Sequence, residues 1–220
     1  ALSTITFPAV IKPQAGGMEY GKLQFPGQRK AYAAQDLPSA LDTLTTIKNA
    51  GFAGHMLVQD MVVGDDTYSW IVSGYVDSRG VVTGVATGRQ ILGLHQTSFI
   101  GNAGIIHVVQ NDELRDMTEK VIAELGLRGF FSIDIKIDSR TNKPYLLDVN
   151  PRWGRGSYFV AVGGVNLAAA MVADFIDGLK LEPRVADREG VYAFVPTITI
   201  GRWVRDKKLR NHLIKLLLKR

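Results

Sequence analysis

Residues 129–150 constrain the fold of this chain more than any other segment, because they read as two antiparallel strands joined by a five-residue loop at 139–143. Side chains alternate between the two faces of a strand. On the first strand this alternation gathers large apolar residues on one face: Phe131, Ile133, Ile135 and Ile137. On the second strand it sorts together Tyr145, Leu147 and Val149. The pattern predicts one buried face built from both strands.

The opposite face of this predicted hairpin is acidic. The loop length pairs Asp138 with Pro144 and therefore sets Asp134 opposite Asp148. Like charges directly opposite each other on a sheet are destabilising, so we expect a cation between them. Lys136 could supply part of that charge.

A divalent ion fits the acidic face better, and the predicted ligands are Asp134, Asp148 and Asn150. Hard oxygen donors favour Mg²⁺ or Mn²⁺, usually shared with phosphate oxygens. The alternative is a solvated polar face without a metal, because acidic residues on exposed strands are common.

The rest of the chain predicts an α+β fold with antiparallel sheets, since strands outnumber helices and mostly join by hairpins. We expect further strands at 7–13, 30–35, 55–63 and 191–200, and two longer ones around the turn at 77–80. We expect a mobile loop at 14–28 and helices at 36–51, 111–125 and 157–177, with an amphipathic helix at the end.

Composition narrows the function classes. The 220 residues are 46% hydrophobic and contain no cysteine, which excludes disulfides, thiolate metal sites and a cysteine nucleophile. The absence of cysteine also fits a reducing compartment, and we expect a cytoplasmic protein. No apolar run reaches the ~18 residues of a membrane span.

The net charge of +5 is concentrated at one end of the chain. Residues 201–220 hold eight lysines and arginines against Asp206, whereas the first 200 residues hold 18 basic and 20 acidic side chains, a balance of −2. A nucleic-acid-binding domain usually shows a basic face across its fold, so nucleic acid is not an expected partner. The basic tail leaves contact with an anionic membrane or another subunit open.

Several spaced motifs resemble one family in the expected order. They are Val10-Ile11-Lys12-Pro13, residues 58–66, Ser132–Lys136 and residues 147–159, which include Asp148-Val149-Asn150-Pro151-Arg152. The chain is similar over residues 7–182 to ATP-grasp carboxylate–amine ligases, and most similar to the D-aspartate ligases of peptidoglycan cross-bridge synthesis.

The resemblance implies ATP bound between two lobes, an incomplete small lobe at 1–62 and a large lobe with the metal site at 63–200. The basic tail at 201–220, an amphipathic helix, carries none of the resemblance. The resemblance also implies a further domain upstream, so the chain is expected to be a fragment that is inactive alone.

The resemblance also implies roles for single residues. Lys12 would bind the α- and β-phosphates and Arg89 the γ-phosphate. Adenine would be bound by the strand end that contains Gln59, Asp60 and Val62, and the ribose hydroxyls by Asp66. Arg152 would stabilise charge during acyl transfer, and the acid substrate would meet Lys136, Arg155 and Ser157. The four histidines have no ligand spacing and are not expected to be catalytic: His55, His95, His107 and His212.

The function that this resemblance implies is an ATP-dependent ligase that joins a small carboxylic acid to an amine through an acyl phosphate. D-Aspartate and the lysine amine of a peptidoglycan precursor are the implied substrates. Two alternatives remain open: a nucleotide-binding module without ligase activity, and a ligase for another amino acid or small acid. The sequence does not fix the oligomeric state.

Overall fold

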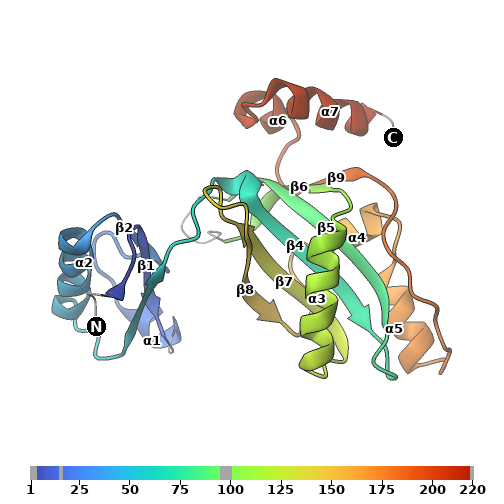
Figure 1. Ribbon diagram of the computed structural model, residues 1–220, viewed down its shortest axis with the longest axis horizontal. Helices are drawn as coiled ribbons and strands as arrows, with labels where there is room; N and C mark the ends of the chain where they lie inside the picture. The colour runs from blue at the N-terminus through green and yellow to red at the C-terminus, as the bar shows by residue number, and fades with distance from the viewer. Residues whose placement is uncertain (1–3, 15–16, 95–100, 219–220) are drawn as a thin grey trace. The chain divides into compact units, whose positions relative to one another are not determined.

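The computed structural model describes residues 4–14, 17–94 and 101–218, and the chain divides into two compact units, Ala1–Val62 and Val63–Arg220 (Figure 1). His95 lies outside the described residues. Helices and antiparallel sheets make up both units, so the predicted α+β class is confirmed. No described helix combines the length and apolar character needed to cross a bilayer.

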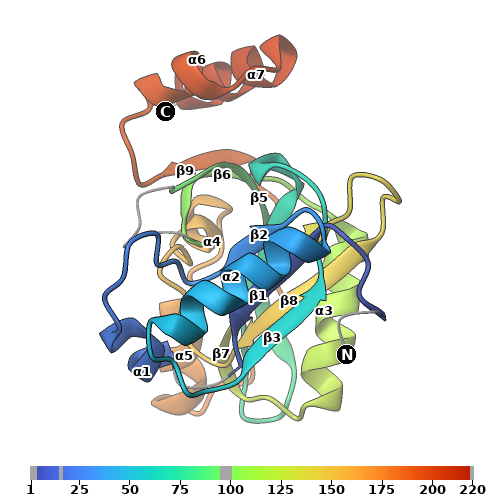
Figure 2. The same cartoon turned by 90° about the vertical axis from the view of Figure 1, so that its left-hand side faces the viewer.

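The first unit is a three-stranded antiparallel sheet in the order β2-β1-β3, with helix α2 packed across it (Figure 2). The strands are β1 (Ala9–Pro13), β2 (Tyr32–Ala34) and β3 (Met56–Asp60), and α2 spans Leu37–Asn49. Asp36 caps α2 by accepting from the Ser39 backbone N–H, as the sequence predicts. The loop expected at 14–28 is partly wrong, because Gly17–Lys22 form a short helix, α1.

The second unit is built on a six-stranded antiparallel sheet in the order β8-β7-β4-β5-β6-β9. Its strands are β4 (Ser69–Val76), β5 (Val82–Gly93), β6 (Ala103–Val108), β7 (Gly129–Ile137), β8 (Pro144–Asn150) and β9 (Gly190–Ala193). A short 3₁₀ turn, η2 (Asp66–Tyr68), leads into β4.

Helices cover both faces of this sheet (Figure 1). Helix α3 (Asp112–Glu124) packs Leu114 and Ile122 against one face, where they meet Val72, Ile133 and other strand residues. Helices α4 (Phe159–Val162) and α5 (Leu167–Phe175) cover the other face. The sheet is therefore the middle layer of three.

The C-terminal segment forms α6 (Ile198–Trp203) and α7 (Lys207–Leu218). Ile200, Val204 and Leu213 are buried with Ile91 and Val191 of the sheet. The amphipathic helix predicted for the basic tail is present, and its apolar side packs against β5, β6 and β9.

Two predicted elements are wrong. The single helix expected at 157–177 is broken at Gly163 and Gly164, where a Cβ on Gly163 would approach the Ala186 Cβ to 2.7 Å and Gly164 has a φ of +96°. The strand expected at 191–200 ends at Ala193, and α6 starts at Ile198. Pro196 lies between them, where a residue without an N–H cannot continue a ladder.

The predicted hairpin forms, but its register differs near the turn. Pro144 pairs with Ile137 and not with Asp138, and a bulge at Leu147 then restores the predicted pairing of Asp134 with Asp148. Tyr145 and Leu147 are consequently exposed, whereas Leu146 and Val149 pack on the core. The expectation that Tyr145 and Leu147 are core residues is therefore wrong.

Candidate functional site

The two carboxylates predicted to face each other do so. Asp134 on β7 is the Cα partner of Asp148 on β8, and Asp134 is partly buried while Asp148 is exposed. Burial raises the pKa of Asp134 to about 6, and repulsion from Asp148 adds to this, whereas the nearby Arg152 acts in the opposite direction. The pair therefore costs folding free energy when both groups are ionised and no cation is present.

Hydrogen bonds connect Asn150 and Arg152 to the carboxylate pair, and we call Asp134, Asp148, Asn150 and Arg152 together the carboxylate ledge. The Asn150 amide donates from Nδ2 to Oδ2 of Asp148 at 3.0 Å, and an Arg152 guanidinium nitrogen donates to Oδ1 of Asn150 at 3.1 Å. Two carboxylates and an amide oxygen thus lie at neighbouring positions of the β7–β8 strand pair. This donor set fits Mg²⁺ or Mn²⁺, which take oxygen ligands.

The loop after β8 is seated tightly against β7. Gly154 donates its N–H to Oγ of Ser157 at 2.9 Å, and a Cβ on Gly154 would lie 2.9 Å from Oγ of Ser132. Ser157 is buried and completes this turn, while Arg155 is exposed. Of the three residues predicted to bind the acid, two belong to this loop: Arg155 is accessible, and Ser157 positions the loop.

Lys136 lies on the same face as Asp134, two residues further along β7. Burial lowers its pKa, and Asp66, Asp65 and Asp138 partly offset that effect. Asp66 in turn accepts the Gly93 backbone N–H at 2.7 Å. Lys136 and Asp66 are therefore electrostatic neighbours at the end of the sheet where η2 enters β4.

Arg89 is not brought to the carboxylates. It is the Cα partner of Trp70, which is itself the partner of Ile135, so alternation places Arg89 on the sheet face opposite Asp134. Its Nε donates to the Thr67 carbonyl at 2.7 Å. Its neighbour Gly88, the partner of Ile71, lies on the carboxylate face.

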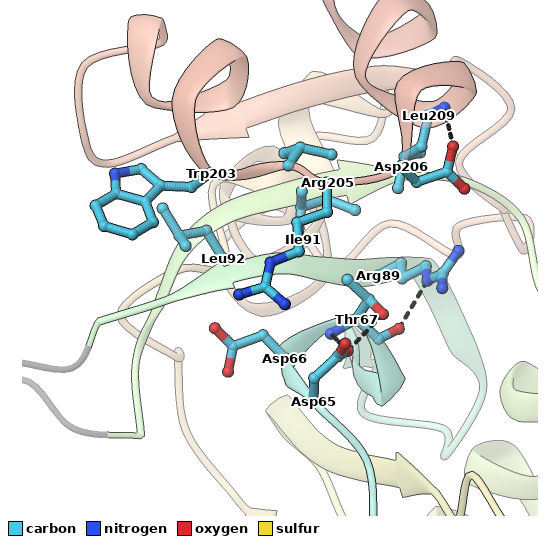
Figure 3. Close-up of a pocket in the computed structure, with 11 residues that line it drawn as sticks. Asp65, Asp66, Thr67, Arg89, Ile91, Leu92, Trp203, Arg205, Asp206 and Leu209 are labelled. Carbon is cyan, nitrogen blue, oxygen red and sulfur yellow. Dashed lines mark hydrogen bonds between the residues drawn. The ribbon is translucent and has the colours of Figure 1, made fainter.

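Arg89 and Asp66 instead line one pocket of about 630 Å³ (Figure 3). Residues from the C-terminal segment, among them Trp203 and Arg205, line the same pocket. The pocket is thus formed by η2, the end of β5 and the segment around α6 and α7.

The remaining predicted residues belong to the first unit. Lys12 and Gln59 lie on the adjacent strands β1 and β3, on the face away from buried Ile11. Asp60 ends β3, and its Oδ1 accepts the Thr6 N–H at 2.9 Å. Val62 is the last residue of this unit.

Comparisons with known proteins agree with this architecture. Residues 87–194 match a family model described as ATP-grasp in the biosynthetic pathway with Ter operon. N5-carboxyaminoimidazole synthetase from Staphylococcus aureus complexed with ADP superposes with a TM-score of 0.61, at 13% identity, over 96% of this chain and 52% of that one. This chain has the ATP-grasp fold.

Further ATP-grasp relatives are found by sequence. D-aspartate ligase of Enterococcus faecium is 29% identical over 217 residues, which are 95% of this chain and 51% of that protein. The large chain of carbamoyl phosphate synthase from Methanobrevibacter smithii is 22% identical over 94% of this chain and 20% of its own length. The predicted resemblance to ATP-grasp ligases, with D-aspartate ligase as a close match, is confirmed. The chain spans about half the length of D-aspartate ligase.

The structure also brings together one cluster of possible metal ligands that the sequence alone does not indicate. His107, Glu189 and His212 converge, although they come from a strand, a loop and the C-terminal helix. Ligand spacing was the only available signal, and it is absent because 82 residues separate the first two and 23 the last two.

Proposed function

We propose that this chain is the nucleotide- and metal-binding part of an ATP-dependent carboxylate–amine ligase. The observation that carries the proposal is the ledge on which Asp134 faces Asp148, with Asn150 and Arg152 hydrogen-bonded beside them. Burial and repulsion from Asp148 raise the pKa of Asp134, and a bound cation would relieve that repulsion at neutral pH.

Mg²⁺ or Mn²⁺ would be held by Asp134, Asp148 and Asn150, and when bound it would neutralise phosphate charge. Oδ1 of Asn150 accepts a hydrogen bond from Arg152 at 3.1 Å, so Arg152 lies beside the proposed metal ligands.

Each proposed nucleotide contact is the one that the resemblance implies for that residue. Lys12 would contact the α- and β-phosphates, and adenine would meet the end of β3 and the segment after it through Gln59, Asp60 and Val62. Asp66, which lines the pocket of the second unit, would take the ribose hydroxyls. Arg89 fits the γ-phosphate less well, because it lies on the opposite sheet face from the carboxylates.

The proposed reaction has two transfers. A carboxylate oxygen of the acid attacks the γ-phosphorus of ATP, ADP leaves, and an acyl phosphate forms. The amine nitrogen then attacks the acyl carbon, the nitrogen loses a proton, and phosphate leaves with the bonding electron pair. Arg152 would stabilise the negative charge that develops on the oxygens, and Lys136 and Arg155 would orient the acid.

The similarity to D-aspartate ligase supports D-aspartate as the acid. The lysine amine of a peptidoglycan precursor as the acceptor, and a cytoplasmic reaction, are proposed from the family resemblance of the sequence. The matches to carbamoyl phosphate synthase and to N5-carboxyaminoimidazole synthetase support a ligase for a different acid as the second candidate. A panel of small acids and amines separates these two.

The test uses a protein that contains this chain together with the upstream domain that the resemblance implies. It measures ADP release from Mg²⁺–ATP with acid alone, amine alone and both together. ADP that appears only with both substrates supports the ligase, and the acid that works identifies the substrate. Nucleotide binding without ADP release for any pair would instead support a nucleotide-binding module. Asp148→Asn serves as the control that removes one proposed metal ligand.

A further inference from the structure

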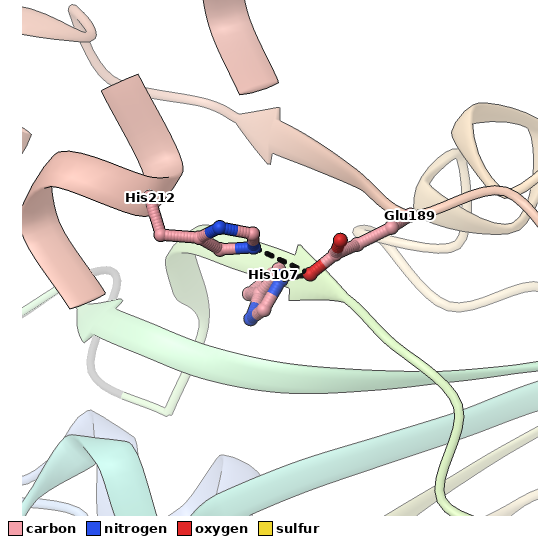
Figure 4. A group of neighbouring side chains, drawn as sticks. All are labelled: His107, Glu189 and His212. Carbon is pink, nitrogen blue, oxygen red and sulfur yellow. Dashed lines mark hydrogen bonds and ion pairs between the residues drawn. The ribbon is translucent and has the colours of Figure 1, made fainter. Parts of the chain in front are cut away.

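Three side chains with donor atoms for metals converge away from the carboxylate ledge (Figure 4). His107 lies on β6, Glu189 directly precedes β9, and His212 lies in α7. His107 is the Cα partner of Arg89, so it lies on the sheet face opposite Asp134. This cluster is therefore separate from the proposed magnesium ligands.

The donor atoms of the three residues point at one position. Nε2 of His107 and Nε2 of His212 each lie 2.7 Å from Oε1 of Glu189. All three atoms lie within 4.8 Å of one another. Two imidazoles and one carboxylate from three separate segments thus bring their donor atoms together.

We propose that His107, Glu189 and His212 bind a transition-metal ion, with Zn²⁺ as the best fit. Two imidazole nitrogens and one carboxylate oxygen are a ligand set that Zn²⁺ accepts, whereas Mg²⁺ prefers oxygen alone. In tetrahedral Zn²⁺ sites neighbouring donor atoms lie roughly 3.4 Å apart. The 2.7 Å contacts must therefore widen when the metal binds, and the Glu189 side chain, which would move, is 38% exposed.

The electrostatic setting matches the forms of these groups that bind metals. Burial lowers the pKa of His107, which keeps its imidazole neutral. Burial would raise the pKa of Glu189, but hydrogen bonds from His212 and His107 lower it overall, so its carboxylate is ionised. Arg89 is a nearby positive charge that would repel a metal ion, and its Nε donates a hydrogen bond to the Thr67 carbonyl. His212 is 47% exposed, so solvent reaches the cluster.

Such a site would fasten α7 to the sheet. Leu213, next to His212, is already buried in the core that α7 shares with β6 and β9. Leu209 of the same helix lines the pocket that contains Asp66 and Arg89. A metal at this position would fix one wall of that pocket, and the inference does not depend on the proposed ligase activity.

The experiment titrates untagged, metal-stripped protein with Zn²⁺ in excess Mg²⁺, which occupies the oxygen-ligand site. Calorimetry should give one saturable Zn²⁺ site per chain and a rise in melting temperature. Co²⁺ in place of Zn²⁺ should give the intense visible absorption of a four-coordinate ion. Absence of saturable Zn²⁺ binding, or a six-coordinate Co²⁺ spectrum, would overturn the proposal.

Variants assign the ligands. His212→Ala, at an exposed helix position, and Glu189→Gln, which keeps the side-chain shape, should each weaken Zn²⁺ binding by about 100-fold or more, since changes even to second-sphere partners cost 10–100-fold. His55→Ala, an exposed histidine of the first unit, should bind Zn²⁺ like the parent. Unchanged affinity in both ligand variants would refute the site.

Discussion

Asp134 carries a charge that responds to pH within an accessible range. Its pKa is raised to about 6, first by burial and then by Asp148. The folded protein therefore binds this proton more tightly than the unfolded chain does. Between about pH 4 and pH 6 the contribution of Asp134 to the free energy of unfolding falls as pH rises, and above pH 6 it stays low. The loss reaches up to about 3 kcal/mol.

Asp134→Asn should abolish that loss. We expect the variant to match the parent near pH 4 and to exceed its free energy of unfolding by up to about 3 kcal/mol at pH 7.5 without divalent ions. Urea denaturation at both pH values gives the difference. A constant difference across the range would show that the Asp134 carboxylate is not destabilised in the folded state.

Arg152 offers a second test at a single position. Its guanidinium donates a hydrogen bond to Asn150, and the residue is exposed. If it acts on the transition state, Arg152→Ala should lower kcat by about 10²-fold or more and change the ATP KM little. Arg152→Lys should restore only part, because the planar fork is lost. Normal kcat with a raised ATP KM would make Arg152 a nucleotide ligand instead.

Among the elements, α3 tests how local capping contributes to stability. Asn111 accepts the Leu114 N–H at 3.1 Å, and α3 supplies Leu114 and Ile122 to the core. Asn111→Ala should cost about 1 kcal/mol of unfolding free energy, while Asn111→Asp should retain most of it. Guanidinium denaturation measures both. Equal loss in the two variants would indicate a role other than capping.

Helix ends and hairpins were the elements that the sequence predicted best, because their signals are local. Asp36 and Asn111 cap the helices expected after them. The break at Gly163 was missed, because it depends on contact with Ala186, which is distant in sequence. The bulge at Leu147 was missed for a different reason. It shifts the alternation by one residue, and the adjacent leucines Leu146 and Leu147 fit either phase.

For the whole molecule, the proposed function predicts that Lys12 contributes to the binding of Mg²⁺–ATP. Lys12→Ala should weaken Mg²⁺–ATP binding by roughly 10- to 150-fold, the loss of one charge-assisted contact. Asp148→Asn should also reduce the rise in melting temperature that Mg²⁺–ATP produces. Without nucleotide, the effects of the two changes on unfolding free energy should add within ~0.5 kcal/mol. A full Mg²⁺–ATP shift in Asp148→Asn would contradict the metal assignment.

In the candidate site, the contacts within one hairpin could be predicted from the sequence, whereas the contacts between distant segments could not. The pairing of Asp134 with Asp148 follows from one hairpin, and the structure has it. The face on which Arg89 lies depends on pairing across three strands, which the sequence does not display. His107, Glu189 and His212 meet only after β6, β9 and α7 have packed, so no spacing could have identified them.

The bulge in β8 leaves Leu147 without a partner on β7, while its neighbour Leu146 pairs with Ile135. Because Leu146 and Leu147 are adjacent and identical, loss of one leaves the same sequence whichever is deleted, Tyr145-Leu-Asp148. A regular ladder would then keep Asp134 opposite Asp148 with a leucine still on the core side. Insertions and deletions of one residue should therefore survive selection at this position. An alignment of homologous chains should show single-residue gaps between Tyr145 and Asp148, and none between Asp148 and Arg152.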